Sequence, residues 1–216
     1  MKYRGIIFDL DGVICHTDQY HYQAWKKLAD KLEIYFDETI NNRLRGVSRM
    51  ESLEIILENC EKIFSKQEKE LLADEKNFFY KELLKKMTRQ DLSREVSETL
   101  VQLREKGFKL AIGSSSKNAK FILRQIGLLD FFDAISDGNN ITHSKPNPEV
   151  FLKAAEFLGL RPDQCLVVED AETGVLAAAN GNMDCAGIGN AAVCGAARYS
   201  LQCFKDLLSV VEGSVL

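Results

Sequence analysis

The sequence is poor in the residues that mark flexible linkers and cysteine-based scaffolds. Only three of its 216 residues are proline, and its six cysteines include no CxxC pair. The scarcity of proline argues against disordered linkers, and 45% apolar residues are ordinary for a globular protein. Several cysteines stand inside apolar runs, so we expect reduced, buried thiols and a cytoplasmic protein.

Other absences argue against whole classes of function. The net charge of −4 leaves no basic footprint for nucleic acid. No stretch approaches the ~20 apolar residues of a membrane helix, and the apolar run near the start is too short for a secretory signal. No GxxxxGKS/T sequence occurs, which excludes a P-loop enzyme. We therefore expect neither a nucleic-acid nor a membrane partner.

Chemistry is suggested first by residues 5–12, Gly-Ile-Ile-Phe-Asp-Leu-Asp-Gly. A continuous apolar run is typical of a strand buried on both faces of a parallel sheet. Residues i and i+2 of an extended chain point the same way, so Asp9 and Asp11 should converge at the strand's carboxyl end. Open α/β sheets bind their ligands at that end. Two carboxylates held together need a cation, a proton or a phosphate-linked partner.

The remaining chain separates into a helical block and an alternating block. Residues 16–88 show helical patterns and no strand pattern. Their predicted helices cover 18–33, 50–60 and 66–87. Farther along, strands are predicted at 108–112, 133–136, 165–168 and 185–188, and helices at 93–106, 117–126, 147–158, 172–180 and 204–211.

This alternation predicts an α/β fold with a Rossmann-like parallel sheet that helices cover on both faces. We expect residues 1–15 and 89–216 to form this core. Residues 16–88 should form an all-helical cap, inserted after the first strand and beside its active end.

Four predicted loops fall at the carboxyl ends of strands and carry polar residues. In chain order they hold Asp9 and Asp11, residues 114–118, Lys145, and Glu169 with Asp170. The second loop precedes a helix N-terminus, where free N–H groups favour a phosphate. Magnesium takes hard oxygen ligands, and Asp9, Asp170 and a main-chain carbonyl near Asp11 could supply them.

Each of these features also has an ordinary structural reading. The Asp-x-Asp pair can be a solvated turn, the serines can cap a helix, and Lys145-Pro146 can be an exposed turn. Glu169-Asp170 can complement a helix dipole. Agreement among four loops at one sheet edge favours a catalytic reading, because together they supply a nucleophile, metal ligands, a phosphate cradle and a cation.

Four segments, 9–13, 114, 145–146 and 168–170, resemble in order the motifs of the haloacid-dehalogenase superfamily of phosphatases and phosphomutases. The resemblance covers essentially the whole chain. It implies that Asp9 is a nucleophile that becomes an aspartyl-phosphate and that Asp11 is a general acid/base. It further implies the catalytic set Asp9, Asp11, Ser114 and Lys145, and a Mg2+ site with Asp9, Asp11, Glu169 and Asp170.

Cap segments 18–25 and 44–53 look like those of the β-phosphoglucomutase subfamily, as do 114–118 and 144–146. The implied reaction interconverts β-D-glucose 1-phosphate and glucose 6-phosphate, with β-glucose 1,6-bisphosphate as intermediate and activator. Such a mutase must hold two phosphates, and Arg49 is a natural cap partner for the second. The expected partner is a small sugar phosphate. No conspicuous apolar helix face demands another chain, so we expect a monomer.

The resemblance also implies a set of substrate contacts: Thr17, His21, Trp25, Arg45, Gly46, Val47, Arg49, Ser52, Lys76, Ser115, Ser116, Lys117 and Asn118. Three of them have alternatives in the sequence itself. His21 shares an apolar stripe with Trp25, so both also fit the seam or core of the cap, and Lys76 stands in a lysine-rich helix. Arg45 replaces a lysine that is common in the subfamily, which bears on the choice of sugar.

Two other functions compete with the mutase. A Mg2+-dependent sugar-phosphate phosphatase would need the same carboxylates but no second phosphate cradle. A non-catalytic sugar-phosphate-binding regulator is disfavoured, because every catalytic position is occupied.

Overall fold

The computed structural model describes residues 2–44, 47–58 and 60–213. At its centre is a six-stranded parallel sheet in the order β3-β2-β1-β4-β5-β6. The strands are β1 (Gly5–Phe8), β2 (Lys109–Gly113), β3 (Ala134–Ser136), β4 (Cys165–Glu169), β5 (Asp184–Gly187) and β6 (Tyr199–Ser200). The central position of β1 brings the ends of β2 and β4 to either side of the two aspartates.

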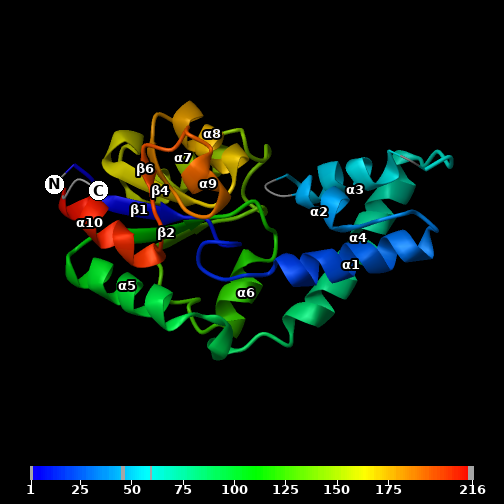
Figure 1. Ribbon diagram of the computed structural model, residues 1–216, viewed down its shortest axis with the longest axis horizontal. Coiled ribbons are helices and arrows are strands. Elements are labelled where there is room, and N and C mark those ends of the chain that lie inside the picture. Colours follow the sequence, from blue (N-terminus) through cyan, green and yellow to red (C-terminus); the bar gives the residue numbers. More distant parts are fainter. Residues whose placement is uncertain (1, 45–46, 59, 214–216) are drawn as a thin grey trace.

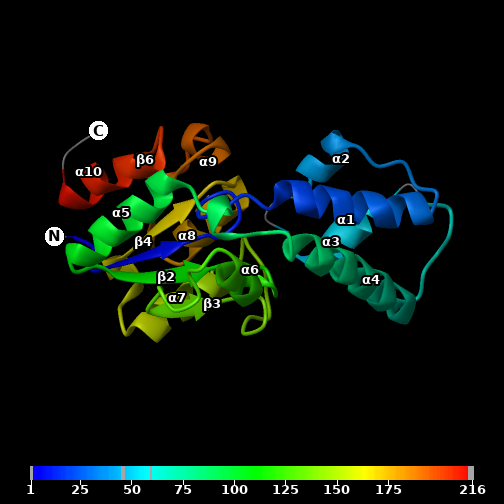
Figure 2. The same ribbon diagram turned by 90° about the horizontal axis from the view of Figure 1, so that it is seen from below.

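Helices cover both faces of the sheet (Figures 1 and 2). They are α5 (Arg94–Glu105), α6 (Ala119–Gln125), α7 (Glu149–Leu158), α8 (Glu172–Asn180), α9 (Asn190–Val193) and α10 (Leu207–Glu212). Short 3-10 turns cover η1 (Arg89–Asp91), η2 (Pro162–Gln164) and η3 (Phe204–Asp206). Ile6 and Phe8 pack into the cluster with α5, α6 and α10, whereas Ile7 packs with α7 and α8. This burial on both faces explains the unbroken apolar run of β1.

Four more helices form a separate unit: α1 (Asp18–Lys31), α2 (Glu38–Asn42), α3 (Arg49–Leu57) and α4 (Lys66–Leu84). We call them the cap helices. They enclose their own apolar cluster around Trp25 and Leu53. Figure 1 shows them to one side of the sheet, with α10 at the opposite end of the core. The arrangement agrees with an inserted helical cap, while its exact boundaries at 15/16 and 88/89 stay a prediction.

The predicted fold class is confirmed, and the differences lie in short elements and helix ends. Helix α2 was missed because it has only five residues; its N-cap Asp37 accepts a hydrogen bond from the Ile40 amide at 2.9 Å. Helix α9 and the two-residue β6 were missed for the same reason. The helices predicted at 18–33, 50–60 and 66–87 end two or three residues earlier than expected.

Among the residues that the structure describes, no helix combines the length and apolar character needed to cross a membrane.

Candidate active site

The site begins where β1 ends. Asp9 is only 7% exposed, and its amide donates to the Val168 carbonyl at 2.9 Å, which ties the end of β1 to β4. Gly12 follows with a φ of +90°. A Cβ atom there would lie 2.2 Å from the Asp170 carboxylate, so only glycine permits this approach. The β1 and β4 loops are therefore pressed together, with carboxylates from both.

Lys145 lies buried between two of these carboxylates. It forms ion pairs with Asp9 and Glu169 and is 4% exposed. The second oxygen of Glu169 accepts the amides of Asp170 and Ala171 at 2.9 and 3.0 Å. Glu169 therefore orients Lys145 and the β4 loop; its predicted role as a direct metal ligand stays a prediction.

Burial and charge together set the protonation of this group. Burial raises the pKa of Asp9 well above its ordinary value, Lys145 opposes that shift, and Glu169, Asp170 and Asp11 add to it. Burial alone would lower the pKa of Lys145, but the ion pairs with Asp9 and Glu169 raise it. The Lys145 ammonium group therefore opposes the rise in the pKa of Asp9 and favours its ionised form.

The donor set fits a hard divalent cation. Asp170 presses on the β1 loop and raises the pKa of Asp9 by charge repulsion, which a cation between them would relieve. Within the described ranges, no group of three or more His, Cys, Asp or Glu side chains has metal-binding geometry. A site with two carboxylates and a main-chain carbonyl needs no such group, because Mg2+ completes its shell with water and substrate phosphate.

The 114–118 loop follows β2 and is folded by its own hydroxyl groups. The Ser114 hydroxyl accepts the Ser116 amide at 3.1 Å, and the Ser116 hydroxyl accepts the Asn118 amide at 3.2 Å. Ser114 is 2% exposed, and its amide donates to the Ser136 carbonyl at 3.0 Å. The Asn118 side chain donates to Asn77 on α4 at 2.8 Å, so this core loop also contacts the cap.

The cap contributes a cationic wall opposite the carboxylates. Lys76 is 2% exposed and lies 3.0 Å from Nδ1 of His21, with its ammonium 4.5 Å from the ring centroid of Trp25. Burial lowers the pKa of Lys76, and the nearby Arg49 lowers it further. Burial, Lys76 and Arg49 lower the pKa of His21 in the same way. A neutral His21 then accepts from Lys76, and a phosphate dianion would relieve the repulsion among these groups.

Asp11 is held by a short chain of hydroxyl groups. The Thr17 hydroxyl donates to Oδ1 of Asp11, and the Tyr80 hydroxyl donates to Thr17 at 3.1 Å. Burial raises the pKa of Asp11 to about 6, although the Thr17 hydrogen bond opposes the shift. A carboxyl group with that pKa can both donate and accept a proton near neutral pH.

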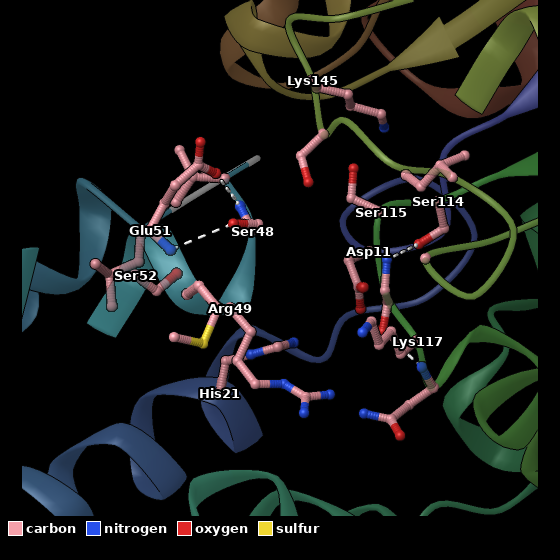
Figure 3. Close-up of a pocket in the computed structure, with 18 of the residues that line it drawn as sticks. Asp11, His21, Ser48, Arg49, Glu51, Ser52, Ser114, Ser115, Lys117 and Lys145 are labelled. Atoms are coloured by element: carbon pink, nitrogen blue, oxygen red, sulfur yellow. Dashed lines mark hydrogen bonds between the residues drawn. The ribbon is translucent and has the colours of Figure 1, made fainter. Parts of the chain in front are cut away.

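One cavity of about 1220 Å³ joins the two sides. In Figure 3, Ser114, Ser115 and Lys145 from the core face Ser48, Arg49 and Ser52 of the cap across it.

Comparison with known proteins places the chain in a family. Residues 3–182 match the family model of haloacid dehalogenase-like hydrolases. The chain belongs to this family. The β-phosphoglucomutase of Bacillus subtilis is 42% identical over 188 residues, which cover 86% of this chain and 83% of that protein. A phosphorylated carbohydrates phosphatase of Thermotoga maritima is 30% identical, over 83% of this chain and 82% of its own.

A solved structure of a β-phosphoglucomutase from Clostridium difficile superimposes with a TM-score of 0.92 at 38% identity. The match covers 98% of this chain and 96% of that one. The resemblance seen in the sequence is thereby confirmed for the haloacid dehalogenase-like family and for the likeness to β-phosphoglucomutases.

The haloacid dehalogenase-like fold brings most of the predicted site residues to this cavity. Those that line it are Asp9, Asp11, His21, Trp25, Val47, Arg49, Ser52, Lys76, Ser114, Ser115, Ser116, Lys117, Asn118, Lys145, Glu169 and Asp170. Thr17 does not line the cavity but lies behind Asp11, bonded to it. Arg45 and Gly46 lie outside the described residues.

Sequence reasoning missed several lining residues on α4, among them Asn77 and Tyr80. Together with Ala73 and Lys76 they follow the i, i+3, i+4, i+7 spacing of one helix face. That spacing was the available signal, but the many charged residues of α4 obscured it.

Proposed function

We propose that the protein is a β-phosphoglucomutase, an isomerase that interconverts β-D-glucose 1-phosphate and glucose 6-phosphate. The observation that carries the proposal is a single cavity with phosphoryl-transfer carboxylates on one wall and two basic side chains of the cap, Lys76 and Arg49, on the other. A mutase must hold a second phosphate while it transfers the first. Two proteins named β-phosphoglucomutase support the same conclusion: one is 42% identical in sequence, and the solved structure of the other superimposes with a TM-score of 0.92.

The core wall performs the transfer. Phosphorylated Asp9 passes its phosphoryl group to the C6 hydroxyl of β-glucose 1-phosphate, while Asp11 takes the hydroxyl proton. The resulting β-glucose 1,6-bisphosphate turns end for end. Asp9 then attacks the phosphorus of the 1-phosphate, the bond to the C1 oxygen breaks, and Asp11 returns the proton to that oxygen. The products are glucose 6-phosphate and the phosphorylated enzyme.

The protein depends on a divalent metal, which we propose to be Mg2+. Asp9, Asp170 and the Asp11 carbonyl would hold the ion. When bound, it neutralises the charge between the nucleophile and the phosphate oxygens. Lys145 supplies a second positive charge to Asp9 from within the protein.

The distal phosphate would contact Arg49 and Lys76 on the cap and the 114–118 loop of the core. Binding between these walls would draw the cap toward the core and exclude water, so that the aspartyl-phosphate reacts with a sugar hydroxyl.

The test is product analysis with β-glucose 1-phosphate, Mg2+ and a trace of β-glucose 1,6-bisphosphate. We expect glucose 6-phosphate, dependence on the bisphosphate, and no turnover of α-glucose 1-phosphate, which serves as the matched control. Loss of activity with EDTA and its return with Mg2+ would test the metal.

A second candidate is a Mg2+-dependent sugar-phosphate phosphatase, which the 30% identity to the Thermotoga maritima phosphatase favours. Release of inorganic phosphate from several sugar phosphates, without glucose 6-phosphate from the β-1-phosphate, would decide for this candidate and against the mutase.

A further inference from the structure

Tyr80 is a fully enclosed residue of α4 that the proposed mechanism does not use. It is 1% exposed, and its hydroxyl donates to the Thr17 hydroxyl at 3.1 Å. Its ring lies against two substrate-facing groups of the cap. The centroid of the His21 ring is 4.0 Å away, and the Lys76 ammonium lies 4.6 Å from the Tyr80 centroid.

The three hydroxyl and carboxyl groups form a chain with one direction. Each hydroxyl has a single proton to donate. The Tyr80 hydroxyl donates a hydrogen bond to the Thr17 hydroxyl. Thr17, which is 0% exposed, in turn donates a hydrogen bond to Oδ1 of Asp11. The reverse direction would bury the phenolic proton without an acceptor among the described residues, which is costly. The Tyr80 hydroxyl therefore points the Thr17 proton at Asp11.

We propose that Tyr80 is a positioning residue for proton transfer by Asp11, acting through the hydroxyl of Thr17. A carboxyl group rotates about a single bond, so fixing one oxygen fixes the plane of both. With Oδ1 held by Thr17, Oδ2 is the oxygen that exchanges the proton with the sugar. A donor that is itself hydrogen-bonded is also a stronger donor, because bonds in a chain polarise one another.

This inference rests on the proposed acid/base role of Asp11 and extends it to a residue of the cap. Lys76 and His21 contact the Tyr80 ring, so the cap wall that faces the distal phosphate and the acid/base group share one rigid support. Removing the hydroxyl alone leaves the ring and these contacts in place.

The experiment compares Tyr80→Phe with wild type as the Mg2+-loaded enzyme, by steady-state kinetics and thermal unfolding. We expect kcat to fall about three- to tenfold, the size of one lost hydrogen bond, with KM within twofold. Tyr3→Phe is the matched control. Tyr3 is also buried and donates to a carboxylate, Asp184, but it precedes β1 and so lies at the other edge of the sheet. Its removal should leave kcat unchanged.

Thr17→Val provides a second test, because it removes the hydroxyl that links Tyr80 to Asp11 and leaves the shape of the side chain unchanged. In that background Tyr80→Phe should have no further effect on kcat. An unchanged kcat in Tyr80→Phe, an equal loss in the Thr17→Val background, or an effect on KM alone would overturn the proposal.

The proposed mutase activity is decided separately, by the wild-type products. Should the protein prove to be a phosphatase, the same kcat ratios are measured on phosphate release, since Asp11 would protonate the leaving oxygen there as well.

Discussion

Asp9 and Asp11 differ in the partner that opposes the effect of burial on their pKa values. Asp9 is shielded from water but paired with Lys145, so burial and the ion pair push its pKa in opposite directions. Asp11 has a hydroxyl partner in place of a cation, and burial raises its pKa to about 6. Burial therefore raises the pKa of both aspartates, but only Asp9 contacts a buried ammonium group, and this difference in partner suits a nucleophile beside an acid/base group.

Replacing the nucleophile tests this division directly. Asp9→Asn should lower kcat at least about 10³-fold, because the amide cannot form the covalent phosphoenzyme. Incubation with β-glucose 1,6-bisphosphate and mass spectrometry should show a phosphorylated wild-type chain and an unmodified variant. The control is Asp163→Asn, a solvent-exposed aspartate paired with Arg161. A phosphorylated Asp9→Asn chain would place the nucleophile elsewhere.

Asp11→Asn tests the raised pKa through stability. A carboxyl whose pKa is higher in the folded than in the unfolded protein stabilises the fold below its unfolded pKa of 3.8, and this contribution is lost as pH rises through about 6. Asparagine keeps the acceptor for Thr17 but carries no charge. When the pH is raised from about 4 to about 7.5, the free energy of unfolding of the variant should increase by about 1–3 kcal/mol relative to that of the wild type.

The measurement is urea unfolding at both pH values in EDTA, so that no cation compensates the charge. A difference between variant and wild type that is the same at both pH values would contradict the raised pKa.

At the scale of elements, the loop after β1 requires glycine for two separable reasons. Gly12 and Gly107 have similar φ values of +90° and +85°, so alanine at either should cost about 1–2 kcal/mol of strain. A Cβ at Gly12 would also collide with Asp170, whereas one at Gly107 meets nothing within 4 Å. Urea unfolding should show both losses. Only Gly12→Ala should lose activity, at least about tenfold, with a higher Mg2+ requirement.

Equal Mg2+ dependence in the two glycine variants would contradict the assignment of Asp170 to the metal site.

The core elements were predictable because their signals are local. The composition of β1 and β4, an uninterrupted run of apolar residues, is enough to predict a central strand that is buried on both faces of the sheet. The polar groups that follow them, Asp9, Asp11, Glu169 and Asp170, could be placed together because parallel strands share a carboxyl edge.

The cap wall was less predictable, because tertiary packing creates it. Lys76 is one of many charged residues on α4, and nothing in the sequence marks it as 2% exposed. Its burial arises where α4 packs on α1, against His21 and Trp25. The role of the Tyr80 hydroxyl likewise could not be predicted, because its hydrogen-bond partner Thr17 lies more than sixty residues earlier in the sequence.

At the scale of the whole molecule, the cap helices have an apolar cluster of their own, although Tyr80 and Leu84 of α4 pack in a core cluster. Trp25 and Leu53 lie in the cluster of the cap helices, while the nucleophile's strand lies in the two clusters of the core. The proposed metal ligands all lie in the core, whereas the distal phosphate would also contact the cap, so the cap should respond to the phosphate and not to the metal.

Trp25 offers a reporter for the cap wall, since it is the single tryptophan and lies 4.5 Å from the Lys76 ammonium. We expect glucose 6-phosphate to change its emission, because a phosphate drawn to Lys76 alters the charge over the ring. Arg49→Ala should weaken this binding about 10- to 100-fold, as the loss of a charge-assisted contact. Arg43→Ala is the matched control: Arg43 pairs with Glu58 in solvent and does not line the cavity. Mg2+ alone should leave the emission unchanged, and a response to Mg2+ as large as that to the sugar phosphate would contradict the separation of the two walls.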